Sequence, residues 1–180
     1  MASNRHLGRI IVLQSLYEYE FRRRINDNSA DLEEILERNL DRYKDKIGDK
    51  DFVYKLAAGV HRASKQLDAV IAPVAPDWPL SQISIIDHSI LQMAVFELTE
   101  FHDSVPPKVA INEAVELAKA FGQDNSSRFV NGVLGTIWRQ MNEGSDEQAK
   151  KADTSRAKAK PTVSPKPAQL AKERPQSAEQ

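Results

Sequence analysis

The chain has 180 residues, of which 41% are hydrophobic, and it contains no cysteine. This length is enough for one domain with a substantial core, and the lack of cysteine excludes disulfide bonds and thiolate metal sites. Residues 1–144 hold 17 Lys and Arg against 21 Asp and Glu, whereas residues 145–180 hold 8 against 5. The body is therefore not a generally basic nucleic-acid-binding protein, so any such binding must rest on a local cluster or on a partner.

The N-terminal region carries one short apolar stretch, which Gln14 interrupts and three arginines follow. It lacks the order of charge, apolar core and cleavage site that defines a signal peptide. No apolar run approaches the roughly 18 residues of a membrane span. The sequence therefore predicts a cytoplasmic protein with no membrane contact.

Apolar residues three and four apart predict helices through the first half of the chain. The first is expected from about residue 5 to 23, the second over 30–43 with Ser29 as its N-cap, and the third over 50–71. The first helix is expected to turn five large side chains inward: Ile10, Leu13, Leu16, Tyr17 and Phe21. The third is expected to bury Val70 among others.

Three prolines at 73–79 predict a break after the third helix. A short helical turn near 80–83 follows, then helices that start near residue 86, at Pro107 and at Ser126. Val109 is expected to line the helix that starts at Pro107, and Gly122 is expected to take a left-handed conformation after that helix. No segment has the pattern of a strand, so the sequence predicts an all-α protein of about seven helices.

The last predicted helix ends near residue 141, with Gly144 just beyond it. Residues 145–180 contain no aromatic residue and four of the nine prolines. A segment of this composition buries too little apolar surface to offset its ordering entropy. We therefore predict a helical domain over 1–144 and a disordered tail over 145–180.

The sequence contains no phosphate loop, dinucleotide fingerprint or paired-histidine zinc motif. The four histidines stand singly, at His6, His61, His88 and His102. An isolated histidine on a helix is seldom a catalytic residue or a ligand. The sequence therefore predicts no enzyme, no cofactor and no metal site.

A first candidate binding cluster lies at the start of the first helix. Arg5 and Arg9 are four residues apart and share a face, His6 is adjacent, and Tyr17 lies two turns beyond Arg9. Cations and an aromatic ring on one helix suit single-stranded RNA, whose phosphates take the charge and whose bases stack. The alternative is that the arginines are ordinary surface residues and Tyr17 belongs to the core.

A second candidate lies in "SSRFVNGVLGTIW", residues 126–138. One face of this predicted helix carries only small residues, Gly132, Gly135 and Thr136. Small residues on one face predict the close approach of another helix. Arg128 and Phe129 fall in the first turn, where free N–H groups and the helix dipole favour an anion. A phosphate and a base could bind there, although a buried Phe129 is the equal alternative.

The chain resembles the bacterial NusB family of transcription antitermination factors. The resemblance rests on "VAINEAVELAKAFG" at 109–122 and "FVNGVLG" at 129–135, supported by three further segments: "LQSLYEYEF" at 13–21, "LAAGV" at 56–60 and "IDHSILQMAVFEL" at 86–98. It extends over residues 5–142. It implies two small helical bundles that the first helix bridges.

The resemblance also implies a function in transcription antitermination. A protein of this kind pairs with NusE, a small-subunit ribosomal protein, and binds boxA RNA of nascent rRNA transcripts. It then joins the elongating RNA polymerase with other Nus factors. The resemblance implies Asp87 as a partner contact, and it implies an RNA site made of Arg5, His6, Arg9, Gln14, Tyr17, Ser126, Arg128 and Phe129.

Three positions depart from the family pattern. The N-terminus has two arginines where a denser basic run is common, Gln92 stands where arginine is common, and Asn125 stands where an acidic residue is common. Two alternatives therefore stay open. One is a protein–protein adaptor without RNA function, and the other is a targeting domain that acts with a separate rRNA-modifying enzyme.

Overall fold

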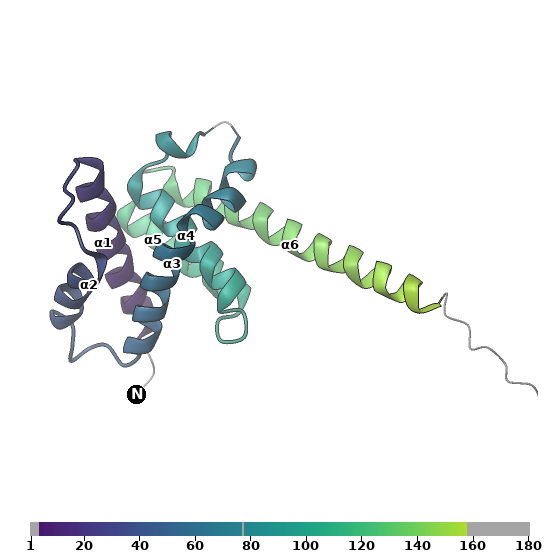
Figure 1. The fold of residues 1–180 in the computed structure, drawn as a ribbon, viewed down its shortest axis with the longest axis horizontal. Coiled ribbons are helices and arrows are strands. Elements are labelled where there is room, and N and C mark those ends of the chain that lie inside the picture. Colours follow the sequence, from purple (N-terminus) through teal and green to yellow (C-terminus); the bar gives the residue numbers. More distant parts are fainter. Residues whose placement is uncertain (1–3, 77, 158–180) are drawn as a thin grey trace, which may run out of the picture. The chain divides into compact units, whose positions relative to one another are not determined.

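The structure is a computed structural model that describes residues 4–76 and 78–157, with side chains through Glu143. The chain divides into two units, Met1–Glu143 and Gly144–Gln180. The described residues form helices and no strand, as predicted (Figure 1). Six are α-helices: α1 (Arg5–Arg24), α2 (Leu32–Asp41), α3 (Lys50–Ile71), α4 (Ile85–Glu100), α5 (Pro107–Phe121) and α6 (Ser126–Ala157). The predicted turn near 80–83 is a 3-10 turn, η2 (Leu80–Gln82), and another, η1 (Ala72–Val74), follows α3.

Side-chain caps fix where four of the described helices begin, α1, α2, α3 and α4. Asp31 accepts the N–H of Glu34 at the start of α2, and Asp49 accepts the N–H of Phe52 at the start of α3. The prediction that Ser29 caps the second helix was wrong. Ser29 instead donates both its N–H and its hydroxyl to Asp27 in the preceding loop. These bonds, with the Arg22 guanidinium, lower the pKa of Asp27 to about 2.

Helix α4 is the centre of the body. Ten of its sixteen residues are buried, on all sides of the helix. It contacts α1, α3 and α5, while α1 also packs against α2 and α3. Because α1 touches both the α2–α3 pair and α4, it joins the two halves of the helical body, and its start is held between them.

Four side chains that periodicity placed inward are exposed. They are Phe21, which is 47% exposed, and Tyr17, Val70 and Val109. Phe21 stacks on Tyr17, with ring centroids 6.2 Å apart and an interplanar angle of 15°. The apolar stripe of α1 is therefore wider than the surface that α2, α3 and α4 cover, and its edge faces solvent.

The predicted close helix crossing at Gly132 is absent, because no atom of the described residues lies within 4 Å of a Cβ built at Gly132 or Gly135. The tight contact is at Gly59 on α3, where a Cβ would lie 2.0 Å from the Phe96 ring on α4. Gly122 does not take the predicted left-handed conformation, since its φ is −87°. A Cβ there would instead lie 2.4 Å from Cβ of Ser126.

Helix α6 does not end near residue 141 as predicted. It continues through Gly144 to Ala157, so Gly144 was misread as a stop signal. The remainder of the predicted tail, residues 158–180, lies outside the described residues. In the part of the chain that the structure describes, no helix is long and apolar enough to cross a bilayer.

Candidate nucleic-acid interface

The first predicted cluster, at the start of α1, is largely paired within the protein. Arg9 is 3% exposed. Its Nε donates to Glu97 Oε1 at 2.8 Å and its Nη2 donates to Glu97 Oε2 at 2.6 Å. The guanidinium carbon also lies 5.1 Å from the centroid of the Phe52 ring. The Arg9 guanidinium is therefore enclosed and bound to a carboxylate in this structure, and its contact with RNA stays a prediction.

Arg5 and His6 are more open than Arg9, yet each has an acidic neighbour. Arg5 Nη2 lies 3.0 Å from Asp49 Oδ2, and Arg5 Nη1 donates to the Ser104 carbonyl oxygen at 3.2 Å. His6 Nδ1 lies 2.8 Å from Glu113 Oε2. A phosphate at this end of α1 would have to compete with those carboxylates.

Two carboxyl pKa values in this network shift in opposite directions. The N–H of Phe52, followed by the Arg5 guanidinium, lowers the pKa of Asp49 despite partial burial. Burial raises the pKa of Glu97, and the Arg9 guanidinium opposes that rise. A buried charge without its partner is strongly destabilising. Replacement of either Arg9 or Glu97 alone should therefore destabilise the fold, because the remaining side chain is left buried and unpaired.

Gln14 and Tyr17 are exposed on α1, as an RNA contact requires. Tyr17 is twelve residues beyond Arg5, which corresponds to about 18 Å along a helix. Arg5, which could bind a phosphate, and Tyr17, which could stack on a base, are therefore too far apart to contact the same nucleotide, and they do not form one compact site. Phe21, which stacks on Tyr17, extends the aromatic surface away from the arginines.

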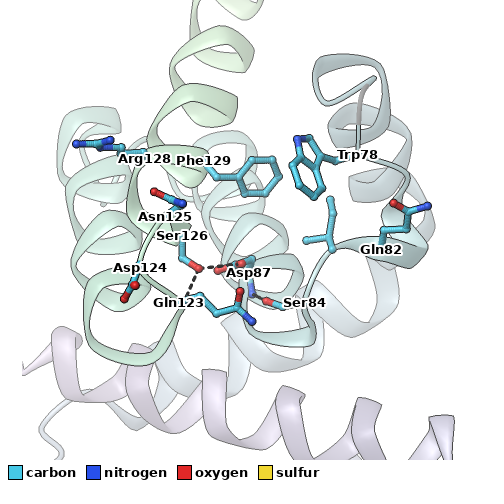
Figure 2. Close-up of a pocket in the computed structure, with 11 residues that line it drawn as sticks. Trp78, Gln82, Ser84, Asp87, Gln123, Asp124, Asn125, Ser126, Arg128 and Phe129 are labelled. Atoms are coloured by element: carbon cyan, nitrogen blue, oxygen red, sulfur yellow. Dashed lines mark hydrogen bonds between the residues drawn. The ribbon is translucent and has the colours of Figure 1, made fainter.

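The second predicted cluster, at the start of α6, is built differently. Ser126 is buried, and its hydroxyl donates to Asp87 Oδ2 at 2.9 Å while accepting the N–H of Gln123 at 2.8 Å (Figure 2). Both functions of the Ser126 hydroxyl are therefore used within the protein, one toward α4 and one toward the loop before α6, and an RNA contact of Ser126 stays a prediction. The close approach of Gly122 to Ser126 belongs to the same joint.

Asp87, the predicted partner contact, is also mostly enclosed. It is 8% exposed, its N–H donates to Ser84 Oγ, and its Oδ2 accepts from Ser126. Its Oδ1 has no hydrogen-bond partner among the described residues. Asp87 therefore positions the start of α6, and it is not an acidic side chain projecting from the surface.

Arg128 and Phe129 are the predicted residues that the structure presents to solvent together. Arg128 is exposed and makes no ion pair or side-chain hydrogen bond with the described residues. Phe129 is half-buried, and its ring meets Trp78 edge to face with centroids 6.5 Å apart (Figure 2). Both line a cavity of about 1130 Å³ between the start of α6, the start of α4 and the loop before it.

Sequence reasoning missed two residues that shape these sites. Trp78, which is 57% exposed and forms one wall of the cavity, was noted only as part of a proline-rich break. An aromatic residue between two prolines was the signal available for it. Glu97, the partner of Arg9, stood within an apolar helix, where an acidic residue in a core stripe indicates a buried ion pair.

An all-helical body with an exposed arginine that is unpaired among the described residues, at a cavity lined by aromatic rings, is typical of a binding protein. Comparison with known proteins supplies its family. The NusB family model matches residues 6–139, and the chain belongs to the NusB family. It is 41% identical over 138 residues to the transcription antitermination protein NusB of Chloroflexus aggregans, covering 76% of this chain and 88% of that protein. It is 43% identical over 138 residues to the NusB of Roseiflexus sp., covering 76% and 93%.

A solved structure of NusB from T. maritima is similar, with a TM-score of 0.67 and 36% identity over 76% of this chain and 92% of that chain. The fold class predicted from the sequence is thereby confirmed. The prediction that the protein is not an enzyme is also confirmed, because the NusB family comprises transcription antitermination factors.

Proposed function

We propose that this protein, together with NusE, binds boxA RNA of nascent rRNA transcripts and joins the elongating RNA polymerase with other Nus factors, in the cytoplasm. Its membership of the NusB family supports an antitermination role. A protein of the same fold, 21% identical with a TM-score of 0.65, has been solved as NusB and NusE in complex with dsRNA. That structure supports the fold, and it makes NusE and RNA the first partners to test.

The observation that carries the RNA assignment is the unpaired Arg128 beside Phe129 at the start of α6. The helix dipole and the free N–H groups of a first turn favour a phosphate there, and the Phe129 ring can stack on a base. We assign Arg5, His6, Gln14 and Tyr17 to a second stretch of the same RNA path. Arg9, Ser126 and Asp87 support these contacts by holding α1 and α6 in place.

We propose that NusE docks beside the start of α4 and contributes basic surface next to this path. Residues 1–144 carry four more acidic than basic residues, 21 against 17, so long-range attraction of RNA to this chain alone is weak. A cationic partner would raise both the affinity and the rate of association. Binding by the pair should therefore be much tighter than binding by either protein alone.

Fluorescence anisotropy with labelled boxA RNA tests the proposal, measured for this protein alone, for NusE alone and for the mixture. The mixture should bind most tightly, and a scrambled RNA of the same composition should bind less tightly. If the mixture binds both RNAs equally and weakly while the two proteins still associate, the protein is an adaptor. If a methyltransferase, and not NusE, co-purifies with it from its native cell, the targeting-domain alternative holds.

A further inference from the structure

The cavity at the start of α6 has a polar floor and an aromatic wall. Trp78 approaches it from the loop before α4, Asp87 from the first turn of α4, Asn125 from the loop before α6 and Phe129 from the first turn of α6 (Figure 2). Ile83 also lines it. Its volume of about 1130 Å³ lies just above the range of about 300–1,000 Å³ for small-molecule sites. The space is therefore large enough for a planar heterocycle.

The floor contains a hydrogen-bond acceptor that the protein leaves unused. Asp87 is 8% exposed and Oδ2 accepts from Ser126, but Oδ1 has no partner among the described residues. An unsatisfied buried oxygen is costly, and hydrogen bonds to ionised groups are among the stronger ones. A ligand that brings an N–H donor to this carboxylate would relieve that cost.

The wall contains an aromatic face that the protein leaves uncovered. Trp78 is 57% exposed, and Phe129 meets it at an interplanar angle of 63°, so the two rings contact by an edge. An edge-to-face contact covers a face of only one of the two rings, and Trp78 keeps more than half of its surface exposed. An indole with an open face next to a hydrogen-bond acceptor can stack a flat ligand and read its edge at the same time.

The charges around the cavity favour a neutral ring over a charged group. Asp87 and Asp124 are among its lining residues and disfavour a phosphate inside it, whereas Arg128 offers a cation among the same lining residues. The same arginine disfavours entry of a basic side chain from a protein partner. A nucleotide fits this charge pattern when its phosphate lies at Arg128 and its neutral base enters the cavity.

We propose that this cavity is a nucleobase pocket in which Trp78 stacks an unpaired RNA base and Asp87 accepts hydrogen bonds from that base. The proposal rests on the RNA-binding function proposed above and adds the selection of one base. Guanine is the preferred occupant, because its N1–H and its N2 amino group are adjacent donors on one edge. Uracil, cytosine and adenine bring fewer donors to a single carboxylate.

Trp78 fluorescence provides the first test. The chain has two tryptophans, so Trp138→Phe leaves Trp78 as the single indole. Addition of boxA RNA in the presence of tryptophan-free NusE should quench its emission. In the otherwise unchanged protein, Trp78→Ala should weaken RNA binding by about 5- to 100-fold through loss of one stacked base. Trp138→Ala, checked for an unchanged melting temperature, is the matched control and should keep the parent affinity.

Replacement of guanine by inosine provides the second test, because inosine lacks the N2 amino group. Exchanging the guanines of the RNA one at a time should weaken parent binding about 10-fold at one position. In Asp87→Asn, which keeps an oxygen for Ser126, this discrimination should fall to about 2-fold or less. Asp103→Asn makes the same change beyond the far end of α4, at a side chain 95% exposed, and should keep the discrimination.

The outcomes separate this proposal from the one on which it rests. If Arg128→Ala weakens RNA binding but Trp78→Ala does not, RNA binding stands and the base pocket is wrong. If no variant changes RNA binding because the parent and NusE together do not bind RNA, the proposed function itself fails. If Trp78→Ala and Asp87→Asn instead weaken association with NusE and spare RNA affinity, the pocket holds a protein side chain and the nucleobase assignment is overturned.

Discussion

The start of α1 and the start of α6 carry similar residues in different environments. Each carries an arginine, yet Arg9 is bound in two places to Glu97 and enclosed, whereas Arg128 is exposed and unpaired among the described residues. The Arg9 guanidinium lies over the Phe52 ring of the core, whereas Arg128 and Phe129 line a cavity. An arginine and an aromatic residue near a helix start are therefore candidates for nucleic-acid contact only where no carboxylate from another helix binds the arginine.

The largest expected effect comes from breaking the enclosed pair. Arg9→Ala leaves Glu97 buried without its cation, which should lower the free energy of unfolding by about 3–5 kcal/mol. Arg128→Ala removes an exposed side chain and should change it by no more than about 0.5 kcal/mol. Urea unfolding followed by circular dichroism measures both values. Equal stability of Arg9→Ala and the parent protein would show that the pair is not a structural anchor.

A pair of glycines sharpens the same contrast between enclosed and open positions. Gly59→Ala sets a Cβ against the Phe96 ring and should destabilise the protein by about 1–3 kcal/mol. Gly132→Ala enters open space on an exposed helix surface and should stabilise it by up to about 1 kcal/mol. Thermal melts compare the two variants. A destabilised Gly132→Ala would restore the close crossing that the sequence predicts.

Asp49 offers a pH-dependent test of the start of α1. Asp49→Ala removes an N-cap and should lower stability by about 1 kcal/mol at pH 7. Because the native state lowers the pKa of Asp49, the unfolded chain binds more protons as the pH falls, and the contribution of this carboxylate decreases below about pH 4. The difference between parent and variant should therefore shrink in acid. A difference that stays constant from pH 7 to pH 3 would contradict the assigned shift.

The smallest expected effect concerns the positive charge of Arg5, which forms an ion pair with Asp49. Asp49→Asn retains a capping oxygen but releases Arg5 from its ion pair. RNA affinity in the presence of NusE should rise modestly, and the slope of log affinity against log salt should steepen by up to about 0.7. Asp103→Asn, which alters an exposed carboxylate elsewhere, is the control. An unchanged slope would mean that Arg5 does not meet the RNA.

Much of the fold follows from local sequence signals. Periodicity placed α3 over its observed span, and Pro107 and Ser126 were predicted as the first residues of α5 and α6. What failed depends on neighbours distant in sequence. The burial of Arg9 requires Glu97, which is 88 residues away, and the openness of Gly132 depends on which helix happens to cross α6. The spacing of apolar residues along one helix predicts neither the burial of Arg9 nor the exposure of Gly132.

The candidate site shows the same division. Arg128 and Phe129 were found because their type and their place at a helix start suggest anion binding. The enclosure of Ser126 was not foreseen, since it depends on Asp87 on α4, 39 residues away. Trp78 was missed because a loop residue has no periodicity, and only the folded chain shows which ring it meets.

The most direct test of the account is the salt dependence of boxA RNA binding in the presence of NusE. The account predicts that Arg128→Ala flattens the slope of log affinity against log salt by about 0.7, the value for one lost phosphate contact on single-stranded RNA. A matched variant replaces Arg9 and Glu97 together by leucine, an exchange of a buried ion pair that is often neutral for stability. It should keep the parent slope. A flattened slope in the leucine variant with an unchanged slope in Arg128→Ala would contradict the account.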